Sequence, residues 1–73
     1  SDEPPSLERY TKLLQAIDTL PSKQQMILRL KHIEGLEVEE IADLVKMSHD
    51  AIYQNLSRAR RAILEQFKNR KDG

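Results

Sequence analysis

The feature that most restricts the fold is a three-residue interruption, Lys46-Met47-Ser48, between two runs that both favour helix. Apolar residues recur at helical spacing on either side of it, and Ser48 is a good N-cap for the second run. Two helices joined by so few residues cross at a steep angle, as in a helix-turn-helix. The interruption therefore predicts that motif, with helices at about 38–45 and 48–68.

Two further helices are expected upstream, at about 6–19 and 22–34. In the first helix, Ser6 is predicted to be the N-cap and Leu20-Pro21 to end the helix. In the second helix, Pro21 is predicted to lie in the first turn and Gly35 to end the helix in a left-handed conformation. Residues 1–5 are interpreted as a linker or an expression remnant, and residues 6–70 as one domain. Spacing assigns the following residues to the core: Leu7, Tyr10, Leu14, Ile17, Met26, Ile27, Leu30, Ile33, Ile41, Ala42, Leu44, Val45, Ile52, Leu56, Ala59, Ile63 and Phe67. The predicted fold is all-α, a compact four-helix bundle with a helix-turn-helix, like a winged helix without the wing.

Composition excludes several other classes of protein. The 73 residues contain no cysteine and only two histidines, so neither disulfides nor a zinc site are expected. No apolar run is long enough for a membrane span or a signal sequence. Ser48, His49 and Asp50 are consecutive and point in different directions, whereas catalytic side chains must converge. We therefore expect a cytoplasmic protein that is not an enzyme and that uses no cofactor, metal or small-molecule substrate.

The formal net charge is zero, but charge is divided unequally along the chain. Residues 1–45 carry five basic and nine acidic side chains, and residues 46–71 carry seven basic and two acidic ones. This polarity can give the domain one basic face for nucleic acid. It equally fits cations that are stabilised by the dipole of a helix C-terminus.

The last predicted helix has a polar stripe opposite its apolar one. At 100° per residue the polar stripe contains Asp50, Gln54, Ser57 and Arg61, with Arg58 beside it and Tyr53 on its shoulder. In a helix-turn-helix this helix enters the major groove of DNA. Gln54 suits an adenine edge and Asp50 a cytosine amino group. Arg58 and Arg61 suit phosphates.

Short motifs at fixed spacing connect the chain to a known family. They are Leu20-Pro21, Glu34-Gly35-Leu36, Glu40-Ile41-Ala42, Ser48 and Ser57-Arg58-Ala59-Arg60. Together they resemble the C-terminal region 4 domain of bacterial RNA polymerase sigma factors, especially the extracytoplasmic-function type, over about residues 18–67. The resemblance implies a nucleoid-associated domain that reads the promoter −35 element, rests on the flap of the polymerase β subunit and can be masked by an anti-sigma factor.

The resemblance and the polar stripe together give two sets of candidate residues. The base-reading set is His49, Asp50, Tyr53 and Gln54, and the phosphate-binding set is Lys46, Ser48, Ser57, Arg58, Arg60 and Arg61. Three departures stand out. Lys46 replaces the usual turn glycine and must adopt an uncommon backbone conformation. Glu37 replaces a capping Ser or Thr, which predicts a weaker cap. Tyr53 and Asn55 replace common basic residues.

Three functions remain open from the sequence. The first is −35 recognition together with RNA polymerase. The second is a sigma-like protein-interaction module, bound by an anti-sigma factor or another regulator, with weak DNA binding. The third is the helix-turn-helix of a different family, such as the output domain of a response regulator. A sigma factor also needs a −10-reading domain that nothing here resembles, so we expect the chain to be a fragment.

Overall fold

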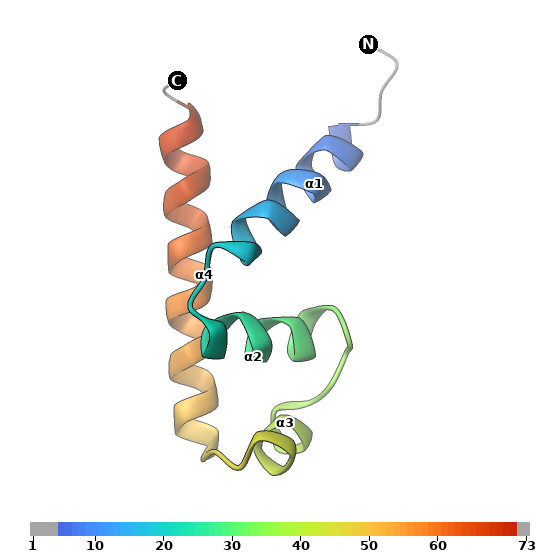
Figure 1. Cartoon of the computed structure of the whole chain (residues 1–73), viewed down its shortest axis with the longest axis vertical. Coiled ribbons are helices and arrows are strands. Elements are labelled where there is room, and N and C mark those ends of the chain that lie inside the picture. Colours follow the sequence, from blue (N-terminus) through green and yellow to red (C-terminus); the bar gives the residue numbers. More distant parts are fainter. Residues whose placement is uncertain (1–4, 72–73) are drawn as a thin grey trace.

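The computed structural model describes residues 5–71, which form four helices and no strand. The helices are α1 (Pro5–Asp18), α2 (Ser22–His32), α3 (Val38–Val45) and α4 (His49–Lys71). The long α4 runs the length of the molecule, α2 packs across its middle, and α3 lies beside its N-terminal end (Figure 1). The predicted all-α fold of four helices is therefore confirmed. None of the described helices is both long and apolar enough to cross a membrane.

The core lies where α2, α3 and the first half of α4 meet. Ile27, Ile41, Ile52 and Leu56 are at most 1% exposed. Each such side chain contributes about 1.5–3 kcal/mol when it is removed from water. The buried Ala59 continues the stripe of α4, as its spacing predicted. Further along, the stripe is only half-buried at Ile63 and Phe67, because α4 extends beyond the helices that cover it.

Several residues assigned to the core are in fact exposed: Leu7, Tyr10, Met26, Ile33 and Leu44. On α1 the cause is the direction of the helix. Its C-terminal end is buried through Ile17 and the following Leu20, whereas its N-terminal half diverges from α4 (Figure 1). On α2 the predicted inward face is rotated by about one residue, because α2 is covered from the side that carries Leu28, which is 4% exposed.

Several helix ends differ from the sequence prediction, and α4 continues to Lys71, beyond its predicted end at about residue 68. Since α1 begins at Pro5, Ser6 lies in its first turn and is not its N-cap, and residues 1–4 of the predicted linker lie outside the described residues. Pro21 occupies the N-cap position before α2 rather than its first turn. Helix α2 ends at His32, two residues earlier than predicted. Gly35 has a φ of 81°, the left-handed conformation that was expected.

Candidate nucleic-acid interface

The turn between α3 and α4 fixes the direction in which α4 leaves the core. Lys46 adopts φ 61° and ψ 49°, the left-handed conformation, as the sequence required. The backbone N–H groups of Lys46 and Met47 both donate to the carbonyl oxygen of Ala42, the latter at 3.2 Å. Ser48 Oγ then accepts the N–H of Ala51 at 3.1 Å, which confirms the predicted N-cap. These bonds end α3 and start α4 within three residues, the geometry of a helix-turn-helix.

The first turn of α3 is also hydrogen-bonded despite its unusual cap residue. Glu40 Oε1 accepts the backbone N–H of Glu37 at 2.8 Å, so a carboxylate one turn into the helix satisfies the chain at its start. Val38, the first residue of α3, is 9% exposed and packs in the core. The first helix of the motif is therefore held both by packing and by this bond.

The N-terminal half of α4 presents polar side chains to solvent. Every predicted base-reading and phosphate-binding residue is exposed: Lys46, Ser48, His49, Asp50, Tyr53, Gln54, Ser57, Arg58, Arg60 and Arg61. Asn55 behaves differently, because it is half-buried and its Nδ2 donates to the carbonyl oxygen of Ala51 at 2.8 Å. The structure therefore brings the candidate residues onto one helix and the turn before it, while their individual contacts with DNA remain predictions.

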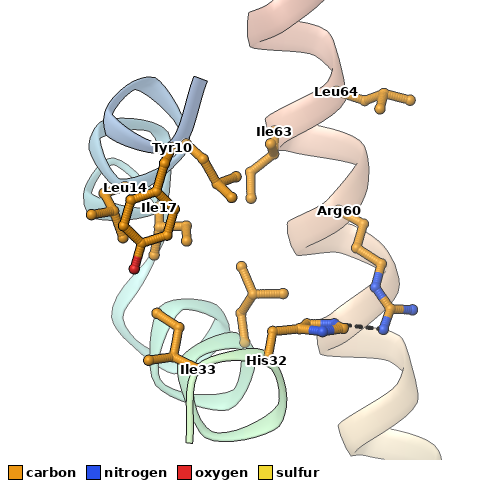
Figure 2. A pocket seen from close by; sticks show the side chains of 10 residues that line it. Tyr10, Leu14, Ile17, His32, Ile33, Arg60, Ile63 and Leu64 are labelled. Carbon is orange, nitrogen blue, oxygen red and sulfur yellow. Dashed lines mark hydrogen bonds between the residues drawn. The ribbon is translucent and has the colours of Figure 1, made fainter. Parts of the chain in front are cut away.

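Arg60 leaves α4 in a different direction from Arg58 and Arg61. Its Nη2 donates to Nε2 of His32 at 2.9 Å, across to the C-terminal end of α2 (Figure 2). Because a guanidinium can only donate, Nε2 of His32 carries no proton in this contact. Burial, followed by the charges of Arg60 and Lys31, lowers the pKa of His32 below its usual 6.5. No local sequence signal indicated this pair, since the partners are 28 residues apart.

Two hollows flank α4 on the side where Arg60 lies. One is apolar, about 440 Å³ in volume, and opens between α1 and α4; its wall includes Tyr10, Leu14, Ile33 and Leu64 (Figure 2). The other is more polar, about 410 Å³, and lies where α2, α3 and α4 meet; its lining is Lys31, Glu37, Val38, Glu39, His49, Tyr53, Leu56 and Arg60. Among the described residues, no three acidic or histidine side chains gather closely enough to hold a metal ion.

Comparison with known proteins decides the family. A family model described as "Sigma-70, region 4" matches residues 10–63, from the middle of α1 to the last third of α4. The chain belongs to the sigma-70 region 4 family. Region 4 domains are DNA-binding helix-turn-helix domains of the transcription machinery, and the α3–turn–α4 unit is that motif in this chain.

One curated relative adds a comparison over nearly the whole chain. The chain is 32% identical over 69 residues to UPF0122 protein YlxM of Bacillus subtilis (strain 168), and the alignment covers 89% of this chain. It spans only 62% of the length of that relative. No solved structure matches this region 4 domain.

Proposed function

We propose that this region 4 domain reads the promoter −35 element in the major groove and docks on the flap of the RNA polymerase β subunit during transcription initiation, as part of an extracytoplasmic-function sigma factor in the cytoplasm. The observation that carries the proposal is the exposed polar stripe of α4. It begins directly after the left-handed turn at Lys46, and the buried Ile52 and Leu56 fix its direction away from the core.

In this proposal the exposed residues have two roles, reading base edges and binding phosphates. His49, Asp50, Tyr53 and Gln54 lie in the first two turns of α4, the part of a recognition helix that reaches base edges. Phosphates on either side of the groove are then contacted by a second set of residues: Lys46, Ser48, Ser57, Arg58, Arg60 and Arg61. Phosphate contacts fix the position of the helix without reading sequence, whereas base contacts select it.

An amide NMR titration with a short generic duplex at low salt tests the DNA-facing surface, because non-specific binding suffices for it. We expect shifts concentrated between Lys46 and Arg61, and their reversal by added salt. If about four phosphates are contacted, the logarithm of the binding constant should fall against the logarithm of salt with a slope near −3.6, roughly 0.9 for each phosphate. Shifts confined to α1 and α2 would contradict the proposal.

Single substitutions can distinguish the residues that bind phosphates from those that contact bases. Arg58→Ala and Arg61→Ala should weaken binding to all duplexes alike, because phosphates are the same in every sequence. Gln54→Ala should change which duplexes are selected from a randomised pool. Arg9→Ala is the charge-matched control, since Arg9 is exposed on the diverging half of α1. Equal losses from Arg9→Ala and Arg58→Ala would mean that only total charge matters.

A second candidate function is favoured by the apolar hollow between α1 and α4. Tyr10, Ile33 and Leu64 expose between 45% and 63% of their surface around it, more apolar surface in one place than isolated exposed residues would give. In this function the domain binds an anti-sigma factor or another regulator and has little affinity for DNA.

Two measurements distinguish the two functions: the binding of Leu64→Asp to a polymerase fragment and the binding of the wild-type domain to a duplex. Leu64→Asp places a charge in the hollow at an exposed position, so the domain should stay folded. Loss of binding to a polymerase β-flap fragment, with DNA binding retained, supports the first function together with docking at this hollow. A domain that binds no duplex even at low salt would leave only the second.

A further inference from the structure

The polar hollow between α2, α3 and α4 lies directly beside the proposed base-reading residues. His49 and Tyr53 of α4 form one wall, and the start of α3, with its N-cap residue Glu37 and with Glu39 of its first turn, forms another. The third wall carries Lys31, near the C-terminal end of α2. Any strand of DNA that passes along this flank of α4 therefore meets charges from three helices.

The path of a DNA backbone over this hollow follows from the geometry of the motif. When a recognition helix occupies the major groove, the first helix of the motif crosses the sugar–phosphate backbone at the edge of the groove. In this domain that first helix is α3, and its N-terminal turn borders the hollow. A phosphate at that edge lies next to the hollow, where a cation stabilises it and a carboxylate repels it.

Lys31 is the cation best placed to meet such a phosphate, but it is already paired. Its Nζ lies 3.8 Å from Oε1 of Glu37. The Lys31 side chain is 28% exposed, whereas that of Glu37 is 79% exposed. The carboxylate of Glu37 is therefore largely in solvent, whereas Lys31 is mostly held against the protein, and the nearby negative charge offsets the charge of Lys31 toward any approaching anion. Arg60, the other cation of the hollow, is bonded to His32.

We propose that Lys31 is a phosphate-binding residue of this interface and that its ion pair with Glu37 lowers the affinity of the domain for DNA. The inference rests on the proposed DNA-binding function and adds to it a residue of α2 and the acidic N-cap residue of α3. Release of Lys31 from Glu37 adds one phosphate contact and removes one repulsive charge from the edge of the groove.

The sequence offers a matched control for this pair. Glu8 and Lys12 form a second glutamate–lysine pair, at 3.5 Å, with side chains 68% and 43% exposed. This pair lies on α1, away from the helix-turn-helix. Glu8→Gln and Glu37→Gln change the net charge by the same amount, and each frees one lysine. Any difference between their effects on DNA binding therefore reports position rather than total charge.

The experiment measures the affinity of the wild type, Glu37→Gln, Glu8→Gln, Lys31→Gln and the Lys31→Gln/Glu37→Gln double variant for one short duplex, by fluorescence anisotropy at several salt concentrations. Glu37→Gln should tighten binding about three- to tenfold at low salt and steepen the logarithmic salt dependence by about 0.9, one phosphate. Glu8→Gln should change affinity less than about twofold, because its pair is distant and screened. In the double variant the steeper salt dependence should disappear, and only the smaller gain in affinity from removing a repulsive charge should remain.

Equal gains from Glu37→Gln and Glu8→Gln would overturn the inference, since only total charge would then matter. A steeper salt dependence that persists in the double variant would also overturn it, because Lys31 would not be the cation that contacts the phosphate. Both results leave the proposed DNA binding standing. If the wild type and every variant fail to bind the duplex at low salt, the proposed function and this inference fall together. Circular dichroism of each variant checks that the helices are intact.

Discussion

The left-handed turn at Lys46 gives the sharpest test of how the helix-turn-helix is built. For a residue that has a Cβ atom, this backbone conformation is unfavourable by about 1–2 kcal/mol. Lys46 adopts it, and its side chain is exposed. Lys46→Gly removes that cost. Glycine also lowers the free energy of unfolding by about 0.5–1 kcal/mol, because it makes the unfolded chain more flexible. We therefore expect Lys46→Gly to raise the free energy of unfolding by about 0.5–1 kcal/mol.

Urea unfolding, monitored by circular dichroism, measures this change in the free energy of unfolding. In a thermal unfolding experiment the melting temperature should rise by roughly 2–8 °C for a domain of this size. Lys46→Ala is the control at the same position, because it removes the charge but keeps the Cβ, and it should not stabilise. Gly35→Ala is the reciprocal control. Gly35 has a φ of 81° and an added Cβ would meet nothing within 4 Å, so this variant should lose about 1 kcal/mol from backbone strain alone.

The same two variants also report on DNA. Both Lys46→Gly and Lys46→Ala remove a predicted phosphate contact, so both should weaken binding to any duplex by a similar factor. Stability should separate the two variants while affinity should not. The reasoning is refuted if Lys46→Gly and Lys46→Ala have equal free energies of unfolding, because the left-handed backbone would then carry no strain.

Three further substitutions test the cap, the core and the histidine. Ser48→Ala should cost about 1 kcal/mol in urea unfolding, because the N–H of Ala51 loses its acceptor; an unchanged midpoint would mean that the cap contributes nothing. Ile52→Asp should leave the domain unfolded by circular dichroism, since Ile52 is 0% exposed and the new carboxylate would be buried without a partner; a normal melting curve would reject the orientation of α4. Folding lowers the pKa of His32 from 6.5, first by burial and then through the charges of Arg60 and Lys31. The unfolded chain therefore binds a proton at His32 more readily than the folded domain does. Wild-type stability should accordingly decline as the pH falls below 6.5. His32→Gln should reduce that decline, and an identical pH profile for both proteins would show that His32 is not its source.

The parts of the fold that were predicted correctly depend on residues close together in the sequence. The turn at Lys46, the Ser48 cap and the left-handed Gly35 each follow from the backbone preferences of one residue and its neighbours. The apolar stripe of α4 was equally readable, because Ile52, Leu56 and Ala59 repeat at the helical period and a long helix gives an unambiguous phase. These local signals were enough to identify the helix-turn-helix and its outward-facing stripe.

The errors arise where a helix has more than one apolar side. On α2, Met26 and Leu28 both suit burial, and only the arrangement of the neighbouring helices selects Leu28. On α1, the periodicity of Leu7 and Tyr10 is that of a buried face, yet the helix diverges from α4 and leaves both exposed. Periodicity describes which residues share a face and contains no information about whether another helix covers it.

The sequence by itself therefore determined the four helices, the turn that joins the last two and the polar stripe that marks the chain as a DNA-binding domain. Only the tertiary structure decided which charges meet. Arg60 reaches His32 and Lys31 reaches Glu37 because α2 packs across α4 next to the start of α3. The first contact joins α4 to α2 and the second joins α2 to the N-cap of α3, so both depend on the angles and positions at which the helices pack and not on the preferences of neighbouring residues.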